Sequence, residues 1–154
     1  MKPASGIKIV TTNRKASYNY HLEDRIEAGI VLTGTEVKSL RAGGANLNDS
    51  YALVKPDAVY LLNCHISPYQ GGNRYNPDPV RTRKLLLHKH EIQKLLGKTE
   101  AKGYSLIPTK IYFSKGKAKI ELALAKGKKK YDKRESIRRR EQDREAAVAI
   151  KHRR

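Results

Sequence analysis

Several residue types that stabilise or localise proteins are scarce in this 154-residue chain. It has no Trp, one Phe, one Met and one cysteine, Cys64. A single cysteine excludes a disulfide framework and a multi-cysteine zinc site, and it fits a reducing compartment. No run approaches the roughly 20 apolar residues of a membrane span, and the N-terminus lacks the apolar region of a signal peptide. We therefore expect a soluble, unexported cytoplasmic protein with no membrane partner.

Acidic residues are also few, which leaves a large positive charge. The 15 Asp and Glu residues face 33 Lys and Arg residues, so the formal net charge is +18. A polyanion is the expected partner of such a surface, and RNA is favoured over a membrane. The nine tyrosines could stack on bases, although a half-buried strand position is the favoured explanation for any single one.

Signs of catalysis are missing too. The sequence has no nucleophile elbow with matching His and Asp, and no Gly-rich phosphate loop followed by Lys and Ser or Thr. His88 and His90 beside Glu91 could bind a metal only with further ligands, and helix capping or phosphate contact is favoured. We predict a protein that is not an enzyme and has no cofactor or metal.

Alternation of apolar and polar residues predicts mostly strands. Expected strands cover residues 18–32, 51–54, 59–66, 85–87, 104–113 and 117–125, and residues 7–10 fit either a brief edge strand or an ordered arm. Short helices are expected from Thr35 to Gly43 and over residues 89–97, and a proline-rich loop over residues 67–82. Short strand spacings without a βαβ rhythm predict a mainly β fold, an antiparallel barrel like the oligonucleotide-binding fold, with two or three short flanking helices.

The composition changes after Ala125, which divides the chain into a barrel domain, residues 1–125, and a basic tail, residues 126–154. In the tail, Lys and Arg far outnumber Asp and Glu and few apolar residues remain. Such a segment cannot bury itself alone, yet its residues form helices well. We predict a disordered tail that folds into a helix on an RNA surface.

Blocks of sequence that occur in order along residues 13–134 resemble the SmpB family (small protein B, or SsrA-binding protein). They are Glu-Ala-Gly-Ile from Glu27, Gly-Thr-Glu-Val-Lys-Ser-Leu-Arg from Gly34, Asn-Leu-Asn-Asp-Ser-Tyr from Asn46, Asp-Pro-Val-Arg-Thr-Arg-Lys-Leu-Leu-Leu-His from Asp78, Lys-Gly-Tyr-Ser-Leu-Ile-Pro from Lys102 and Leu-Ala-Lys-Gly-Lys-Lys-Lys-Tyr-Asp-Lys-Arg from Leu124. The resemblance implies a protein of trans-translation that binds the tRNA-like domain of transfer-messenger RNA (tmRNA). With alanyl-tmRNA it would rescue stalled 70S ribosomes, in the company of elongation factor Tu.

The resemblance also implies two sets of site residues. The tmRNA-facing set is Tyr20, Glu27, Lys38, Arg41, Arg81, Arg83, Lys84, Leu86 and His88. The set for the decoding centre, small-subunit rRNA and the empty mRNA channel is Lys126, Gly127, Lys128, Lys129, Lys130, Tyr131, Asp132, Lys133, Arg134, Ile137, Ile150 and Lys151. Relatives often carry Asn at position 88, and some carry Trp where this chain has Gln142.

Two alternatives remain open from the residues alone. A ribosomal or general single-strand RNA-binding protein would use the same charge and barrel without preferring a tRNA-like elbow. A nuclease or RNA-modifying enzyme would require clustered acid, base or metal-binding residues. For the basic run 81–84, an exposed solubilising strand edge is as good an interpretation as RNA contact.

Overall fold

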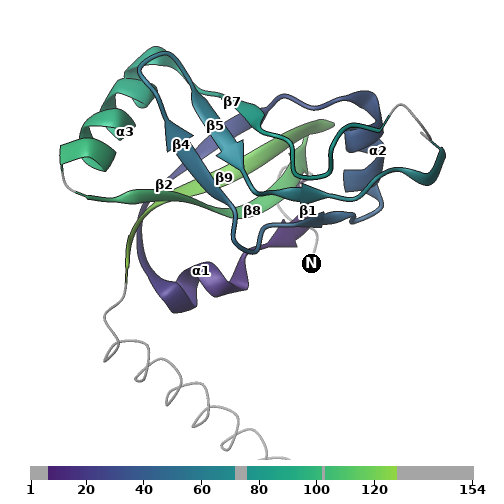
Figure 1. The fold of residues 1–154 in the computed structure, drawn as a ribbon, viewed down its shortest axis with the longest axis horizontal. Helices are drawn as coiled ribbons and strands as arrows, with labels where there is room; N and C mark the ends of the chain where they lie inside the picture. The colour runs from purple at the N-terminus through teal and green to yellow at the C-terminus, as the bar shows by residue number, and fades with distance from the viewer. Residues whose placement is uncertain (1–6, 72–75, 102, 128–154) are drawn as a thin grey trace, which may run out of the picture.

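The computed structural model describes residues 7–71, 76–101 and 103–127, which form a ring of antiparallel strands with helices around it (Figure 1). The elements are β1 (Lys8–Thr12), α1 (Arg14–Asn19), β2 (Tyr20–Ile30), α2 (Gly34–Arg41), β3 (Ala45–Asn46), β4 (Tyr51–Val54), β5 (Val59–Leu62), β6 (His65–Ile66), β7 (Arg83–Leu86), α3 (Lys89–Ala101), β8 (Ser105–Ser114) and β9 (Lys117–Gly127). No described helix is long and apolar enough to cross a membrane.

The sheet closes on itself. Strands β8, β4, β5, β7, β2 and β9 pair in that order, and β9 pairs with β8 again. Strand β1 also pairs with β8, along residues 110–113. All of these pairings are antiparallel. Closure removes exposed strand edges. The prediction of a mainly β antiparallel barrel is confirmed.

Strands β8 and β9 form a long hairpin that makes up a large part of this ring. Its turn contains Lys115 and Gly116, with φ angles of 52° and 76°. Two consecutive positive φ angles give the twist that suits a two-residue hairpin, and glycine adopts such an angle without strain. The alternation of the two flanking strands predicts this connection, and the structure confirms it.

The interior of the barrel is apolar and tightly closed. Val59, Leu61, Ile120 and Leu122 have no measurable exposure. Cys64 is equally buried, and burial raises the pKa of its thiol to about 11. A thiol that stays protonated in an apolar core is a packing residue and a poor nucleophile.

The predicted strand over residues 18–32 begins later than expected, because a helix precedes it. Helix α1 starts after Asn13, whose side chain accepts a hydrogen bond from the Ala16 N–H at 3.2 Å. The Asn13 amide also donates to the backbone oxygens of Leu47 (3.3 Å) and Pro108 (3.0 Å). These contacts with distant segments fix the helix where the period-two pattern alone favoured a strand.

The other predicted elements are present with shifted ends. Helix α2 is capped by Thr33, not Thr35 as predicted, and α3 continues past Gly97 to Ala101. The predicted strand 59–66 is interrupted at Asn63, whose φ is 58°, and becomes β5 and β6. Strand β9 reaches Gly127, two residues beyond the expected end of the barrel. The predicted disorder and helix formation of the tail from residue 128 lie outside the described residues.

Candidate nucleic-acid interface

Three predicted RNA-facing residues meet at one hollow on the barrel surface. Glu27 from β2, Leu86 from β7 and His88 at the start of α3 line a depression of about 340 Å³. The other lining residues are Gly29, Leu87, Glu91 and Lys119. Strands β2 and β7 are neighbours in the ring, so Glu27 and Leu86, which are 59 positions apart in the chain, come together. We call this depression the Glu27 surface.

The carboxylate of Glu27 is held from below by a buried tyrosine. The hydroxyl of Tyr112, a residue that is 5% exposed, donates a hydrogen bond to Glu27 Oε2. On the other side, Lys119 Nζ lies 3.9 Å from Glu27 Oε1. Burial, followed by the hydrogen bond to Glu27, raises the pKa of the Tyr112 hydroxyl. Tyr112 therefore remains a proton donor and keeps the Glu27 carboxylate in one orientation.

Leu86 is the most exposed large apolar side chain of the described residues, at 55%. A Cβ on Gly29, its partner across β2 and β7, would lie 3.2 Å from the Leu86 Cβ. Glycine at position 29 therefore allows the Leu86 side chain to lie close against β2. The exposed fraction leaves an apolar contact available to a ligand.

His88 caps the helix that follows it while its ring stays exposed. Its backbone N–H donates to Glu91 Oε1 at 3.0 Å, and its carbonyl accepts from the Ile92 N–H at 3.0 Å. The His88 and His90 rings stack with centroids 5.6 Å apart. The helix start is therefore capped through the His88 backbone and the Glu91 side chain, and the exposed His88 side chain lies at the edge of the Glu27 surface.

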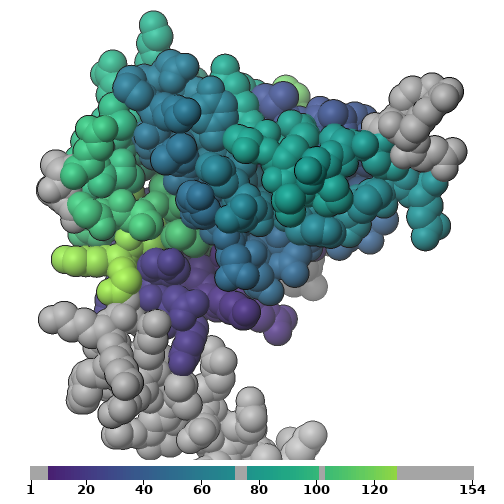
Figure 2. All heavy atoms as spheres, in the orientation of Figure 1, coloured from purple at the N-terminus to yellow at the C-terminus, as the bar shows by residue number. Residues whose placement is uncertain are grey.

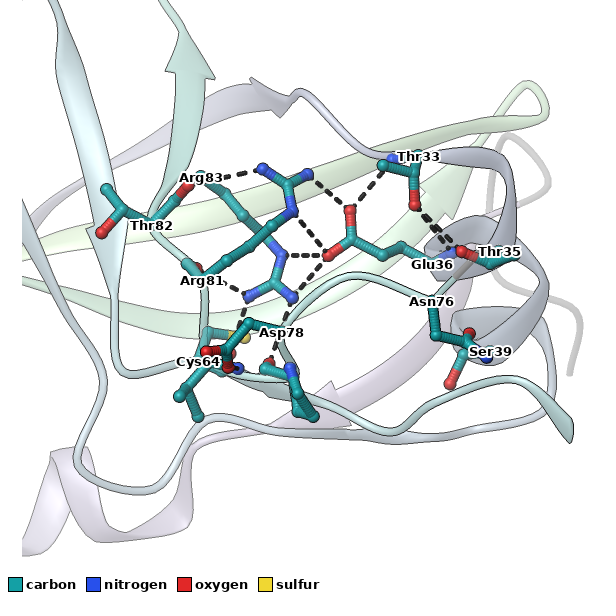
Figure 3. Close-up of polar contacts among 12 residues, drawn as sticks. Thr33, Thr35, Glu36, Ser39, Cys64, Asn76, Asp78, Arg81, Thr82 and Arg83 are labelled. Atoms are coloured by element: carbon teal, nitrogen blue, oxygen red, sulfur yellow. Dashed lines mark hydrogen bonds and ion pairs between the residues drawn. The ribbon is translucent and has the colours of Figure 1, made fainter. Parts of the chain in front are cut away.

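The two arginines of the run 81–84 point the other way, toward Glu36 of α2 (Figure 3). Arg81 Nη2 lies 2.5 Å from Glu36 Oε1, and Arg83 Nη2 lies 2.5 Å from Glu36 Oε2. Glu36 itself completes a capping box, because its side chain accepts from the Thr33 N–H at 2.9 Å. One carboxylate thus joins the start of α2 to the end of the long loop.

Arg83 is fully buried, at 0% exposure. Besides Glu36, its guanidinium donates to the carbonyl oxygens of Cys64 (2.8 Å), Arg81 (3.1 Å) and Pro79 (3.1 Å). A guanidinium with this set of partners has no donors left for a phosphate. The prediction that Arg83 contacts RNA is therefore wrong in this structure, and so is its interpretation as an exposed edge.

The charge on Glu36 is secured by its partners. Burial alone would raise the pKa of this carboxyl, but hydrogen bonds from Arg81, the Thr33 N–H and Arg83 lower it overall. Arg81 is partly exposed, with 28% of its side chain accessible, and donates as well to the Val31 carbonyl at 3.3 Å. Two arginines share one carboxylate, so the cluster carries a net positive charge.

The remaining predicted tmRNA-facing residues are dispersed. Lys84 is exposed on β7, on the strand face opposite to Arg83. Lys38 and Arg41 are exposed on α2, with their cations 5.5 Å from the ring centroids of Tyr69 and Phe113. Tyr20 lies at the far end of β2 and packs against a small cluster around Ala16. None of these four lines the Glu27 surface.

Of the predicted ribosome-facing segment, the structure describes only Lys126 and Gly127, which form the end of β9. Gly127 pairs with Tyr20, and Lys126 with His21, so this end of the chain lies beside α1 and the start of β2 (Figure 2). The Lys126 ammonium lies 5.9 Å from the Tyr104 ring centroid. The other residues of that prediction, from Lys128 to Lys151, lie outside the described residues.

Sequence reasoning missed Tyr112, Lys119 and Gly29. In the sequence, Tyr112 is one more alternating residue of a strand, and its link to Glu27 requires three strands to pair in the order β8, β9, β2. A cross-strand register of this kind is not encoded in a short stretch. The glycine within an alternating strand was the one available signal, because such a residue often marks a close approach.

Comparison with known proteins gives consistent matches. The family model described as "SmpB protein" matches residues 10–152. An SsrA-binding protein of Geobacter metallireducens is 57% identical over 148 residues, 96% of this chain and 97% of that protein. An SsrA-binding protein of Caldicellulosiruptor bescii is 58% identical over 145 residues, 94% of this chain and 92% of that protein.

A solved structure is similar as well. It is described as "tmRNA-SmpB: a journey to the center of the bacterial ribosome", and it is 50% identical with a TM-score of 0.68. The match covers 84% of this chain and 94% of that one.

Proposed function

The chain belongs to the SmpB protein family, and from this premise we propose that it binds the tRNA-like domain of tmRNA and acts in trans-translation on the ribosome. The observation that carries the proposal is the convergence of Glu27, Leu86 and His88 on one surface hollow. Resemblance to the family assigns these three residues to RNA contact, and the fold brings them together from three separate elements.

The chemistry of this surface suits a folded RNA. A fixed carboxylate accepts hydrogen bonds from base amino groups or 2′-hydroxyls, and an exposed leucine contacts the flat face of a base or ribose. Lys119 adds a cation beside them for the phosphate backbone. A surface that combines these three contacts can recognise RNA shape and edges, beyond attracting charge.

We propose a partner role without catalysis, exercised in the cytoplasm. The protein would accompany alanyl-tmRNA and elongation factor Tu into a stalled 70S ribosome. The segment 126–154 would enter the empty mRNA channel, with Tyr131 at the decoding centre against rRNA. The strong excess of basic residues in this segment supports an RNA environment for it.

Binding measurements test the first part of the proposal. Affinity for the isolated tRNA-like domain is compared with affinity for an elongator tRNA and an unrelated RNA hairpin, at two salt concentrations. Nonspecific phosphate contacts weaken steeply with salt, so a preference for the tRNA-like domain that survives higher salt supports specific recognition. Equal and strongly salt-sensitive binding to all three RNAs would favour a general RNA-binding protein instead.

Peptide tagging on stalled ribosomes tests the second part. We expect Tyr131→Ala to leave tmRNA binding intact and to abolish tagging, because stacking on an rRNA base requires the ring. Full tagging by this variant would refute a decoding-centre role for Tyr131. Deleting residues 135–154 should leave the barrel folded, since the described barrel ends at Gly127.

A further inference from the structure

A second hollow continues from the Glu27 surface toward α2. It has a volume of about 430 Å³ and shares Gly29, Leu86 and Lys119 with the Glu27 surface. Its other lining residues are Ile30, Leu32, Val37, Phe113, Gly116, Lys117 and Ala118. The turn of the β8–β9 hairpin and α2, which both contribute lining residues, lie at the same end of the barrel (Figure 1). We call it the hairpin hollow.

The floor of the hairpin hollow is apolar and packs on the barrel core. Ile30 and Phe113 are each 8% exposed and belong to the barrel core, against which Leu32 and Val37 pack. The exposed Leu86 side chain lines both this hollow and the Glu27 surface. Apolar surface of this kind gains free energy when a flat, weakly polar group displaces its water.

The rim of the hairpin hollow carries positive charge. Lys117 and Lys119 line it, Arg41 lies beyond Phe113 with its guanidinium 5.5 Å from the ring centroid, and no carboxylate of the described residues lines it. The Glu27 surface differs, because Glu27 and Glu91 both face it. An apolar floor with two lysines as its charged lining residues matches a ligand whose ring is apolar and whose attached backbone is anionic.

We propose that the hairpin hollow receives one unstacked nucleobase of the RNA that binds the Glu27 surface, an inference that rests on the proposed function. The base lies on the apolar floor beside Leu86, and the phosphates on either side of it face Lys117 and Lys119. Single-stranded loops supply such bases, because their nucleotides can turn out of a stack. An apolar protein segment fits the rim less well, because it brings no negative charge to the lysines.

A coupling experiment between protein and RNA tests this assignment. Single loop nucleotides of the tRNA-like domain are replaced one at a time by abasic nucleotides, and each RNA is titrated with the wild-type protein and with Ala118→Phe. The new ring fills the hollow from β9. We expect one abasic position to weaken binding of the wild type about tenfold and to leave binding of Ala118→Phe unchanged.

The variant itself has to weaken binding of the unmodified RNA by a similar factor. Equal losses in both proteins at every abasic position, or full affinity of Ala118→Phe for the unmodified RNA, would overturn the assignment. Full affinity would also direct attention to a protein occupant of the hollow.

A charge reversal at the rim tests the same assignment if Ala118→Phe does not fold. Lys117→Glu changes the rim of the hollow at an exposed position, and Lys55→Glu makes the same change in net charge at the β4–β5 turn. We expect Lys117→Glu to weaken binding at least about fivefold more than Lys55→Glu. Equal losses would overturn the assignment, because both substitutions would then act only through general electrostatic attraction to the RNA.

Failure of the proposed function is recognised separately. A wild-type protein that binds the tRNA-like domain no better than the unrelated hairpin contradicts that function. The abasic scan is then made on the loop of the hairpin, where the same coupling supports the nucleobase site and its absence overturns it.

Discussion

Arg83 and Leu86 are the first and last residues of strand β7, and each has the burial that would be expected of the other. The charged side chain is 0% exposed and the apolar one is 55% exposed. Burying an arginine costs free energy unless its donors are paired, and exposing a large leucine side chain to water is also unfavourable. Both departures are explained by partners: an interior carboxylate for Arg83 and, in our proposal, RNA for Leu86.

The contrast follows from the strand itself. Alternate side chains of β7 face opposite sides, so Arg83 and Leu85 point inward while Lys84 and Leu86 point outward. Arg83 is therefore close to Leu86 in sequence but faces the other side of the strand, so its positive charge does not indicate where RNA binds. Charge on the inner face ties α2 and the long loop to the barrel, and the outer face is left for recognition.

The largest effect is expected from removing the buried charge. Arg83→Met removes a buried donor from Glu36 and from the carbonyl oxygens of Cys64, Arg81 and Pro79. We expect the free energy of unfolding to fall by about 3–5 kcal/mol, measured by urea denaturation. Lys84→Met, the same change on the outer face, should alter it by less than about 0.5 kcal/mol. Equal losses in the two variants would end the contrast between the two faces.

Removing the exposed leucine should act on binding rather than on stability. Leu86→Ala is expected to weaken binding of the tRNA-like domain about tenfold, because it removes apolar contact with the RNA. The control is Leu53→Ala, another exposed leucine, at 42%, on β4 and outside the Glu27 surface. If both variants bind like the wild type, the exposure of Leu86 has another cause.

Tyr112→Phe sharpens the contrast from inside the barrel. It keeps the buried ring and removes the hydroxyl that donates to Glu27. We expect about fivefold weaker binding of the tRNA-like domain, with salt dependence unchanged, because the carboxylate loses its orientation but no cation is lost. Tyr60→Phe on β5 is the matched control. The same affinity in the two variants would make Tyr112 a packing residue and nothing more.

A smaller effect is expected at the rim of the Glu27 surface. His88→Ala keeps the backbone groups that cap α3 and removes the exposed ring. We expect about threefold weaker binding of the tRNA-like domain, which corresponds to one weak hydrogen bond. Unchanged affinity in a direct titration would remove His88 from the site.

The smallest effect is expected from acid. The pKa of Glu36 is lowered in the folded protein, so below about pH 4.5 the unfolded chain binds more protons at this carboxyl than the folded one. Its contribution to stability is therefore present above the unfolded pKa and is lost as the pH falls through the folded pKa. Because burial opposes the shift, the loss is small. The free energy of unfolding, measured by urea denaturation, should fall more steeply between about pH 5 and pH 3 for the wild type than for Glu36→Gln. Equal pH dependence in the two proteins would contradict this.

Much of the architecture was predictable from local patterns. Alternation over β4, β8 and β9 and the Lys115–Gly116 turn are short-range signals, and they predicted the mainly β barrel correctly. The ordered motifs also identified the family. Helix α1 was missed because Asn13 holds it through Leu47 and Pro108, residues that no local window contains.

The sequence by itself determined the composition of this protein: its charge, its alternating strands, its basic segment 126–154 and the family motifs that name Glu27, Leu86 and His88. Only the tertiary structure decided what each charge does. Glu36 and Arg83 are 47 positions apart, and Tyr112 and Glu27 are 85 apart. Closure of the barrel buries the first pair and places the buried Tyr112 beneath the exposed carboxylate of Glu27. The physical reason is that the cost of burying a charge or fixing a carboxylate depends on partners, which strand pairing supplies and a local pattern does not contain.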